Sequence, residues 1–358
     1  MAACALSVGC ATLMGSPKQT QIDNPNQVEA LTRAQVWQPT NVESMDMLRG
    51  PQDRGAFAPA ATVNCRQVEK EQSGKTPKFA CMVGSDELKV KYGRDNGEVY
   101  AEVAASRLLW ALGFGADRVY PVRVVCAGCP ESLKADSRQP DGRAVFEYAV
   151  VDREVEGYPV PGFEEEGWAW PDLDRVNSAA GGAPKAHRDA LTLLAVLLQH
   201  TDSKREQQRF ICLGPATRDA RPNCPRPFLM IADLGKTFGK ANTLNRDEPG
   251  SVNLKNWRDE RVWREGPECV GNMPKSLTGT LENPVISEAG RRFLAGLLTR
   301  LSDRQMRDLF QAARFPDRAT DGGDNPGAVQ DWVDALKGKI AEVVNRDCAQ
   351  TRQAADAR

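Results

Sequence analysis

A polar segment in the middle of the chain, His200 to Gln207 (His-Thr-Asp-Ser-Lys-Arg-Glu-Gln), carries residue types that can do chemistry. It follows an apolar helical run, Leu191 to Leu198, and a later apolar strand ends at Asp233-Leu234-Gly235. Magnesium-assisted phosphoryl transfer needs one carboxylate that orients the nucleophile's hydroxyl and another that holds the metal. A loop aspartate, Asp202, followed by a strand-end aspartate, Asp233, satisfies both requirements.

The spacing around Asp202 adds to this interpretation. Alone, Asp202 is better explained as a turn or N-cap aspartate after a helix. The block resembles the catalytic loop of the protein kinase superfamily, His-x-Asp-x-Lys-x-x-Asn, which precedes a strand ending in Asp-Phe-Gly. The resemblance implies that His200, Asp202 and Lys204 are catalytic-loop residues, with Asp202 orienting the acceptor and Lys204 neutralising the transferred phosphate. It implies that Gln207, in the place of the usual Asn, binds a metal through its amide oxygen, and Gln208 competes for that position.

Asp233 is the second metal candidate. The Asp-Leu-Gly sequence resembles Asp-Phe-Gly, and a glycine lets the backbone turn so that the carboxylate faces a metal. The alternative is an ordinary strand-end turn, since Asp-x-Gly is common. The segment Gly214 to Pro227 reads as an insertion at a hairpin tip, where extra length costs little.

A lysine and a helical glutamate complete the candidate site. Lys89 and Lys91 alternate along an apolar strand and therefore face the same side, while Glu98 and Glu102 share one face of the following helix. Because Glu102 lies nearer mid-helix and Glu98 is typical of a first-turn acid, we expect the pair Lys91–Glu102. The resemblance implies that this pair binds the phosphates of ATP; solvated strand lysines are the alternative.

Two kinase elements are missing from the sequence. No Gly-x-Gly-x-x-Gly precedes Lys91, where only Gly74 and Gly84 stand, and no Ala-Pro-Glu follows Asp233. The chain therefore resembles atypical branches: phosphatidylinositol-kinase-like, toxin-type and secretory-type kinases. It is also similar to uncharacterised exported bacterial proteins with Lys-Tyr-Gly, Glu-Val-Ala-Ala and Gln-His-Thr-Asp blocks.

The expected activity is a kinase-like transfer of the ATP γ-phosphate, with Mg²⁺, to an unknown hydroxyl on a protein, a lipid headgroup or a small molecule. Two alternatives remain. One is a catalytically inactive pseudokinase that acts as an exported binding or scaffold protein. The other is a kinase-fold enzyme that transfers AMP.

The elements that must position these residues follow from the hydrophobic patterns. Alternating and apolar runs predict strands at 78–83, 87–92, 119–125, 144–151, 209–213 and 228–232. Helices are expected at 98–112 and over 328–345, and a third helix is expected to end at Gln199. Two more should begin at Ser287 and at the capping box that starts with Ser302. This order predicts an α+β, two-lobed protein-kinase-like fold, with a small antiparallel-sheet N-lobe and a mainly helical C-lobe.

The same patterns divide the chain into four parts. We expect a possible signal or lipoprotein leader at 1–15, an extended arm or linker at 16–60, the N-lobe at 61–156 and the C-lobe at 157–358. Leu6-Ser7-Val8-Gly9-Cys10 resembles a lipobox, although the first basic residue is Lys18. We expect export, to the periplasm or to a lipid anchor at Cys10; a cytoplasmic protein is the alternative.

Net charge and cysteine content bear on the protein's partners and on the compartment in which it folds. A net charge of -1 argues against a nucleic-acid partner, and no apolar run is long enough to span a membrane. Of ten cysteines, Cys65 and Cys81, and likewise Cys212 and Cys224, flank turns in a way that favours disulfides. Zinc at Cys126-Ala-Gly-Cys129, which lacks a second Cys-x-x-Cys pair, and reduced buried thiols are the alternatives.

Overall fold

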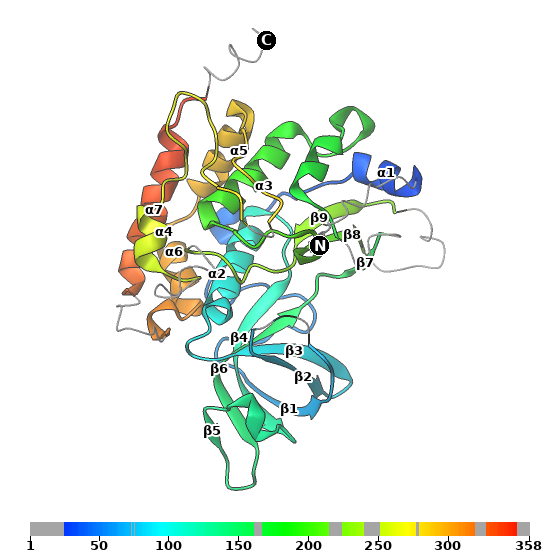
Figure 1. Cartoon of the computed structure of the whole chain (residues 1–358), viewed down its shortest axis with the longest axis vertical. Coiled ribbons are helices and arrows are strands. Elements are labelled where there is room, and N and C mark those ends of the chain that lie inside the picture. The colour runs from blue at the N-terminus through cyan, green and yellow to red at the C-terminus, as the bar shows by residue number, and fades with distance from the viewer. Residues whose placement is uncertain are drawn as a thin grey trace, which may run out of the picture.

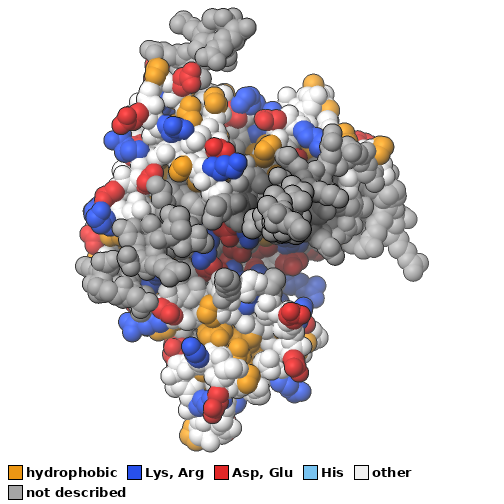
Figure 2. Space-filling view, in the orientation of Figure 1, with side chains coloured by type: hydrophobic (Ala, Val, Ile, Leu, Met, Phe, Trp, Pro, Cys, Tyr) orange, Lys and Arg blue, Asp and Glu red, His pale blue; other side chains and the backbone are white. Residues whose placement is uncertain are grey.

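The computed structural model describes residues 25–72, 74, 76–160, 167–214, 224–239, 251–276, 279–318 and 327–348. The leader expected at 1–15, with Cys10, lies outside the described residues. The structure is a mixed α/β fold, with a strand-rich end and a helix-rich end (Figure 1). Seen from the same side, acidic side chains gather on the surface between these two ends (Figure 2).

A six-stranded sheet forms the strand-rich end, in the order β3-β2-β1-β4-β6-β5. Strand β3 also pairs with β6, so β1, β2, β3, β4 and β6 close into a barrel, and the short β5 extends from β6. The strands are β1 (Thr62–Val68), β2 (Lys78–Val83), β3 (Asp86–Tyr92), β4 (Arg118–Ala127), β5 (Ser137–Arg138) and β6 (Ala144–Arg153).

One pairing corrects the expected antiparallel sheet. Strands β1 and β4 are parallel, while the other neighbours in the sheet are antiparallel. A parallel pair needs a long crossover connection, and the β2–β3 hairpin with the helix after it supplies that connection. The expected antiparallel sheet was therefore wrong for this pair, because local alternation does not report strand direction.

The barrel has its own apolar interior. The rings of Phe79, Tyr92 and Phe146 lie 4.7 to 5.6 Å apart. Two disulfides, Cys65–Cys81 and Cys126–Cys129, belong to the same buried cluster. Cys126 and Cys129, for which a zinc site was the alternative, thus form a disulfide in the structure.

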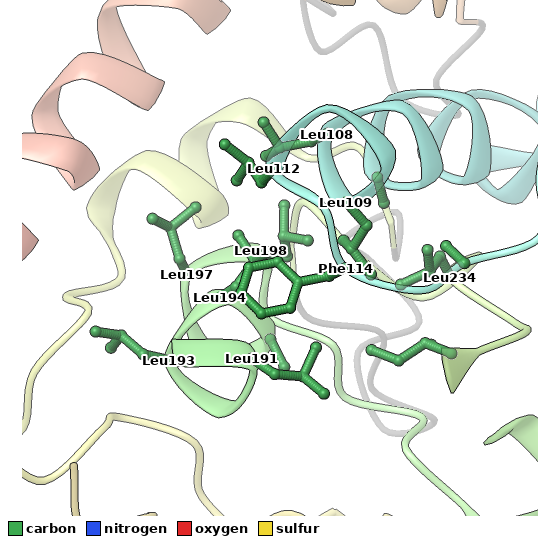
Figure 3. Packing of buried hydrophobic residues seen from close by; sticks show 14 of the residues in the cluster. Leu108, Leu109, Leu112, Phe114, Leu191, Leu193, Leu194, Leu197, Leu198 and Leu234 are labelled. Atoms are coloured by element: carbon green, nitrogen blue, oxygen red, sulfur yellow. The ribbon is translucent and has the colours of Figure 1, made fainter. Parts of the chain in front are cut away.

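Helix α2 (Gly97–Leu112) lies between the barrel and the helical part. The side chain of Asn96 accepts a hydrogen bond from the backbone N–H of Glu98, and Gly113 ends the helix with a φ of 87°. Nearly every residue of α2 is buried, including the charged side chains of Glu98, Glu102 and Arg107. Its leucines meet those of α3 (Lys185–Leu198) in one core cluster (Figure 3).

The helical part follows α3. The backbone N–H groups at the starts of α5 and α6 are capped by Ser287 and Ser302, as the sequence predicts. A second sheet, in the order β7-β8-β9, contributes Phe210, Leu229 and Ile231 to the main core cluster. The elements are α4 (Leu254–Asp259), α5 (Glu288–Leu298), α6 (Asp303–Ala312), α7 (Val329–Asn345), β7 (Gly157–Pro159), β8 (Gln208–Leu213) and β9 (Pro227–Ile231). Short 3₁₀ turns occur at Val42–Ser44, Glu131–Leu133, Trp170–Arg175, Ser178–Ala180, Arg205–Gln207 and Phe315–Asp317.

The segment 25–60 is packed onto the rest of the chain. It begins with helix α1 (Pro25–Thr32), which the polar composition did not predict. The indole of Trp37 donates a hydrogen bond of 2.7 Å to the carbonyl of Leu112. Apolar side chains of the segment enter the main core: Leu31, Ala34, Val36, Val42 and Met47. The arm is therefore part of the folded unit and not a free linker.

Disulfides join the expected cysteines and two further pairs. Cys65–Cys81 and Cys212–Cys224 pair as predicted, and Cys126–Cys129 and Cys269–Cys348 complete the set. Such a set is typical of proteins that fold in an oxidising environment. In the described part of the chain, no helix is both long and apolar enough to cross a membrane.

Candidate functional site

Lys91 lies at the centre of a buried charge cluster. Its side chain is almost fully buried, and its ammonium forms an ion pair with the carboxylate of Glu102. The same Nζ lies 3.6 Å from Glu98 Oε2 and 3.6 Å from Asp233 Oδ1. The structure thus brings together the pair Lys91–Glu102 and Asp233, from β3, α2 and the end of β9.

Burial and charge act in opposite directions on these groups. Burial disfavours the ammonium of Lys91, but Glu102, Asp233 and Glu98 outweigh it and raise its pKa. Burial raises the pKa of Glu102 to about 8, although Lys91 opposes the shift. Burial also acts against ionised Asp233, yet Lys91 and the N–H of Gly235 hold its pKa below the ordinary value. Asp233 therefore has a lower pKa than Glu102.

The cluster has an excess of oxygen donors. One carboxylate oxygen each from Glu98, Glu102 and Asp233 lie within 4.8 Å of one another. Carboxylate oxygens are the ligands that Mg²⁺ prefers. The side chain of Asp233 is 35% exposed, so it can face both the cluster and a ligand.

Glu98 is more than the first-turn acid that the sequence suggested. Its Oε1 accepts a hydrogen bond of 2.8 Å from the hydroxyl of Thr76 and lies 2.8 Å from Lys236 Nζ. A Cβ at Gly235 would lie 2.8 Å from its Cγ, so glycine permits this close approach. Sequence reasoning missed Glu98, Lys236 and Thr76 as site residues. The four-residue spacing of Glu98 and Glu102 was the only available signal.

The loop after α3 holds Asp202 by side-chain contacts. Gln207 Nε2 donates to Asp202 Oδ2 at 2.8 Å, and Lys204 Nζ lies 3.7 Å from Asp202 Oδ1. Gln207 Oε1 accepts the backbone N–H of Lys204 at 3.2 Å. In this structure the amide of Gln207 therefore positions Asp202, and its oxygen is engaged within the loop.

Backbone hydrogen bonds join this loop to the strand end that carries Asp233. The carbonyl of Gln207 accepts the N–H groups of Ala232 at 3.0 Å and of Asp233 at 3.2 Å. The N–H of Thr201 donates to the carbonyl of Lys236 at 3.3 Å. The two aspartates thus stand on adjoining, mutually bonded segments.

His200 is buried beneath the loop and uncharged. Burial lowers its pKa to about 4, against the attraction of Asp233 and Asp202. Neither ring nitrogen has a hydrogen-bond partner in the part of the chain that the structure describes, and the ring packs edge-on against Trp170. His200 therefore lies where it supports the loop. Gln208 is buried as well, and its amide has no partner among the described residues.

Comparisons with known proteins concern the fold. No family model matches the sequence, and no curated protein matches it. Among solved structures, the chain is similar to the Helicobacter pylori proinflammatory kinase CtkA, at 12% identity over 82% of this chain and 98% of that chain, with a TM-score of 0.43. It is also similar to a chain of the Shewanella oneidensis MR-1 toxin–antitoxin complex of HipA, HipB and operator DNA. That likeness has 12% identity over 78% of this chain and 66% of that chain, with a TM-score of 0.30.

Proposed function

We propose that the chain is a kinase-like phosphotransferase that uses ATP and Mg²⁺. The observation that carries the proposal is the buried contact of Lys91 with Glu102 and Asp233, on segments bonded to the loop that holds Asp202. A cation that binds phosphate, a metal-binding carboxylate and a hydroxyl-orienting carboxylate are the parts that phosphoryl transfer requires.

Each residue has a distinct role in this proposal. Lys91, held by Glu102, binds the nucleotide phosphates, and Asp202 accepts a hydrogen bond from the acceptor hydroxyl and takes up its proton. The γ-phosphorus–oxygen bond to ADP breaks as the bond to the acceptor oxygen forms. Lys204, on the same loop, offsets negative charge on the transferred group.

Asp233 is the proposed main ligand of Mg²⁺, which when bound neutralises charge on the phosphates. Glu98 and Glu102 fit the site as further oxygen donors. Gln207 remains a proposed ligand, and to act as one its Oε1 would leave the N–H of Lys204.

The acceptor class and the location complete the proposal. The acceptor is a hydroxyl of a protein, a lipid headgroup or a small molecule. Because the disulfides are typical of an oxidising compartment, we infer export in a bacterium, with Cys10 as the lipid-anchored residue. The periplasm is poor in ATP, so the nucleotide would come from another source outside the cytoplasm.

Nucleotide binding and label transfer test the function. We expect ATP to raise the thermal unfolding temperature in the presence of Mg²⁺, and γ-labelled ATP to label an acceptor from a panel. Asp233→Ala should lose the Mg²⁺-dependent part of the shift, and Asp202→Asn should keep binding but lose transfer by about a hundredfold or more. Asp259→Ala, on the exposed side of α4, is the matched control.

The alternatives give different results in the same experiment. ATP binding without labelling of any acceptor would favour a pseudokinase scaffold. Labelling from α-labelled ATP would show AMP transfer instead. The absence of any ATP-dependent shift would contradict the proposal.

A further inference from the structure

Three lysines share one face of the β2–β3 pair. Lys78, the first residue of β2, is the cross-strand partner of Lys91, and Ala80 is the partner of Lys89. Directly opposed residues of antiparallel strands point to the same face, and like charges placed there destabilise the sheet. Anions close to the lysines offset this repulsion.

Two of these lysines have anionic partners within the protein. Lys89 Nζ lies 2.8 Å from Asp152 Oδ2, and Lys91 contacts three carboxylates. Lys78 has no hydrogen bond or ion pair with any residue that the structure describes. Burial and then Lys91 lower the pKa of Lys78, while Glu98 and Asp233 act in the opposite direction. Among the described residues, Lys78 is therefore a half-buried cation near the site without a counterion of its own.

The turn between β1 and β2 lies against this lysine. Gly74 has a φ of +79°, and a Cβ placed on it would lie 3.3 Å from Lys78 Nζ. Two residues further on, the hydroxyl of Thr76 donates to Glu98, which fastens the turn to the start of α2. The ammonium of Lys78 is thereby held on the side of the barrel that faces Glu98 and Asp233.

We propose that Lys78 is a second phosphate-binding lysine, which contacts the polyphosphate of a nucleoside triphosphate together with Lys91. This inference rests on the proposed function and names the element that replaces the missing glycine-rich sequence. Backbone N–H groups of a glycine-rich loop would supply partial positive charge to the phosphates. Here a full positive charge from the first residue of β2 takes that place, and Thr76 fixes the turn by its bond to Glu98. The ligand recognised is the polyphosphate and not the base.

The affinities of Mg²⁺-ATP and adenosine, measured by calorimetry, test the proposal. Lys78→Met should weaken ATP binding at least about tenfold, as expected for loss of a charged hydrogen bond, and leave adenosine binding unchanged. Lys78→Arg keeps the charge and should retain ATP binding. Lys70→Met is the matched control, because Lys70 is exposed, lies near the same turn and pairs with Glu87.

Folding effects are separated by the unliganded protein. Removing Lys78 relieves its repulsion with Lys91, so Lys78→Met should unfold at the same temperature as the parent protein or slightly higher. Inorganic tripolyphosphate should compete with ATP for the parent protein and less well for Lys78→Met. If the parent protein binds ATP and Lys78→Met binds it equally well, the inference is wrong and the proposed function stands. If the parent protein binds no ATP, both are wrong.

Discussion

The buried charges around Lys91 show how one site gives two carboxyl groups different pKa values. Glu102 and Asp233 both contact Lys91, and Asp233 also accepts a hydrogen bond from the backbone N–H of Gly235 at 3.0 Å. Lys91 and then this N–H lower the pKa of Asp233 although burial acts against them, whereas burial of Glu102 outweighs Lys91 and raises its pKa to about 8. A carboxylate that stays ionised at low pH is the one suited to a cation.

The stability of the protein should fall in acid through His200. Its pKa is lowered from 6.5 to about 4 in the folded protein, so the unfolded chain binds a proton that the folded chain excludes. Its contribution is therefore present above pH 6.5 and is lost as the pH falls toward 4. From pH 7 to pH 5 the loss is about 2 kcal/mol, measurable by urea unfolding with the disulfides intact. His200→Asn should flatten this part of the profile, and an unchanged profile would contradict the burial of a neutral imidazole.

Helix α2 connects the charge cluster around Lys91 to the main hydrophobic core. Its first turns carry Glu98 and Glu102, and its last turns carry the leucines that pack on α3 (Figure 3). The helix ends at Gly113, which lies against the carbonyl of Gln38 and the indole nitrogen of Trp37. The packed arm thus limits where α2 ends.

Replacing Gly113 tests this close contact. Gly113→Ala combines a left-handed backbone, with a φ of 87°, with a Cβ 2.7 Å from Trp37 Nε1. Gly142→Ala is the matched control, because its φ is +82° and no heavy atom would lie within 4 Å of the Cβ. We expect the free energy of unfolding to fall by about 1 kcal/mol in the control, from backbone strain alone. For Gly113→Ala we expect it to fall by about 3 kcal/mol or more. Equal losses in urea unfolding would show that the arm yields without cost.

At the scale of the whole molecule, disulfides stabilise both the barrel and the helical part. Cys126–Cys129 spans a sequence separation of 3, and Cys269–Cys348 spans 79. The second bond joins the segment before α5 to the segment after α7 and so restrains the end of the helical part.

The loop lengths predict that removal of these two disulfides lowers the free energy of unfolding by different amounts. If restriction of the unfolded chain dominates, the double variant Cys269→Ala, Cys348→Ala should lose about 4 kcal/mol, and Cys126→Ala, Cys129→Ala about 2 kcal/mol. Equilibrium unfolding of each double variant gives the comparison. A larger loss for the short-loop pair would indicate that packing of Cys126 and Cys129 in the barrel core outweighs chain entropy.

Local features of the fold were predictable from sequence, and long-range ones were not. The starts of α5 and α6 follow from the capping residues Ser287 and Ser302. The pairs Cys65–Cys81 and Cys212–Cys224 follow from the turns that they flank. Helix α1 escaped prediction because its stability comes from packing of Leu31 in the main core and not from its polar composition.

The amino-acid sequence by itself determined the order of Lys91, Glu102, Asp202 and Asp233 and the strand or helix that carries most of them, because these depend on nearest-neighbour patterns. Only the tertiary structure decided that β3 pairs with β6 to close the barrel. It alone showed that Glu98 bonds to Thr76 and Lys236, and that Gln207 turns its amide toward Asp202. These features depend on which distant segments meet in space, and on the buried charges that then have to be compensated.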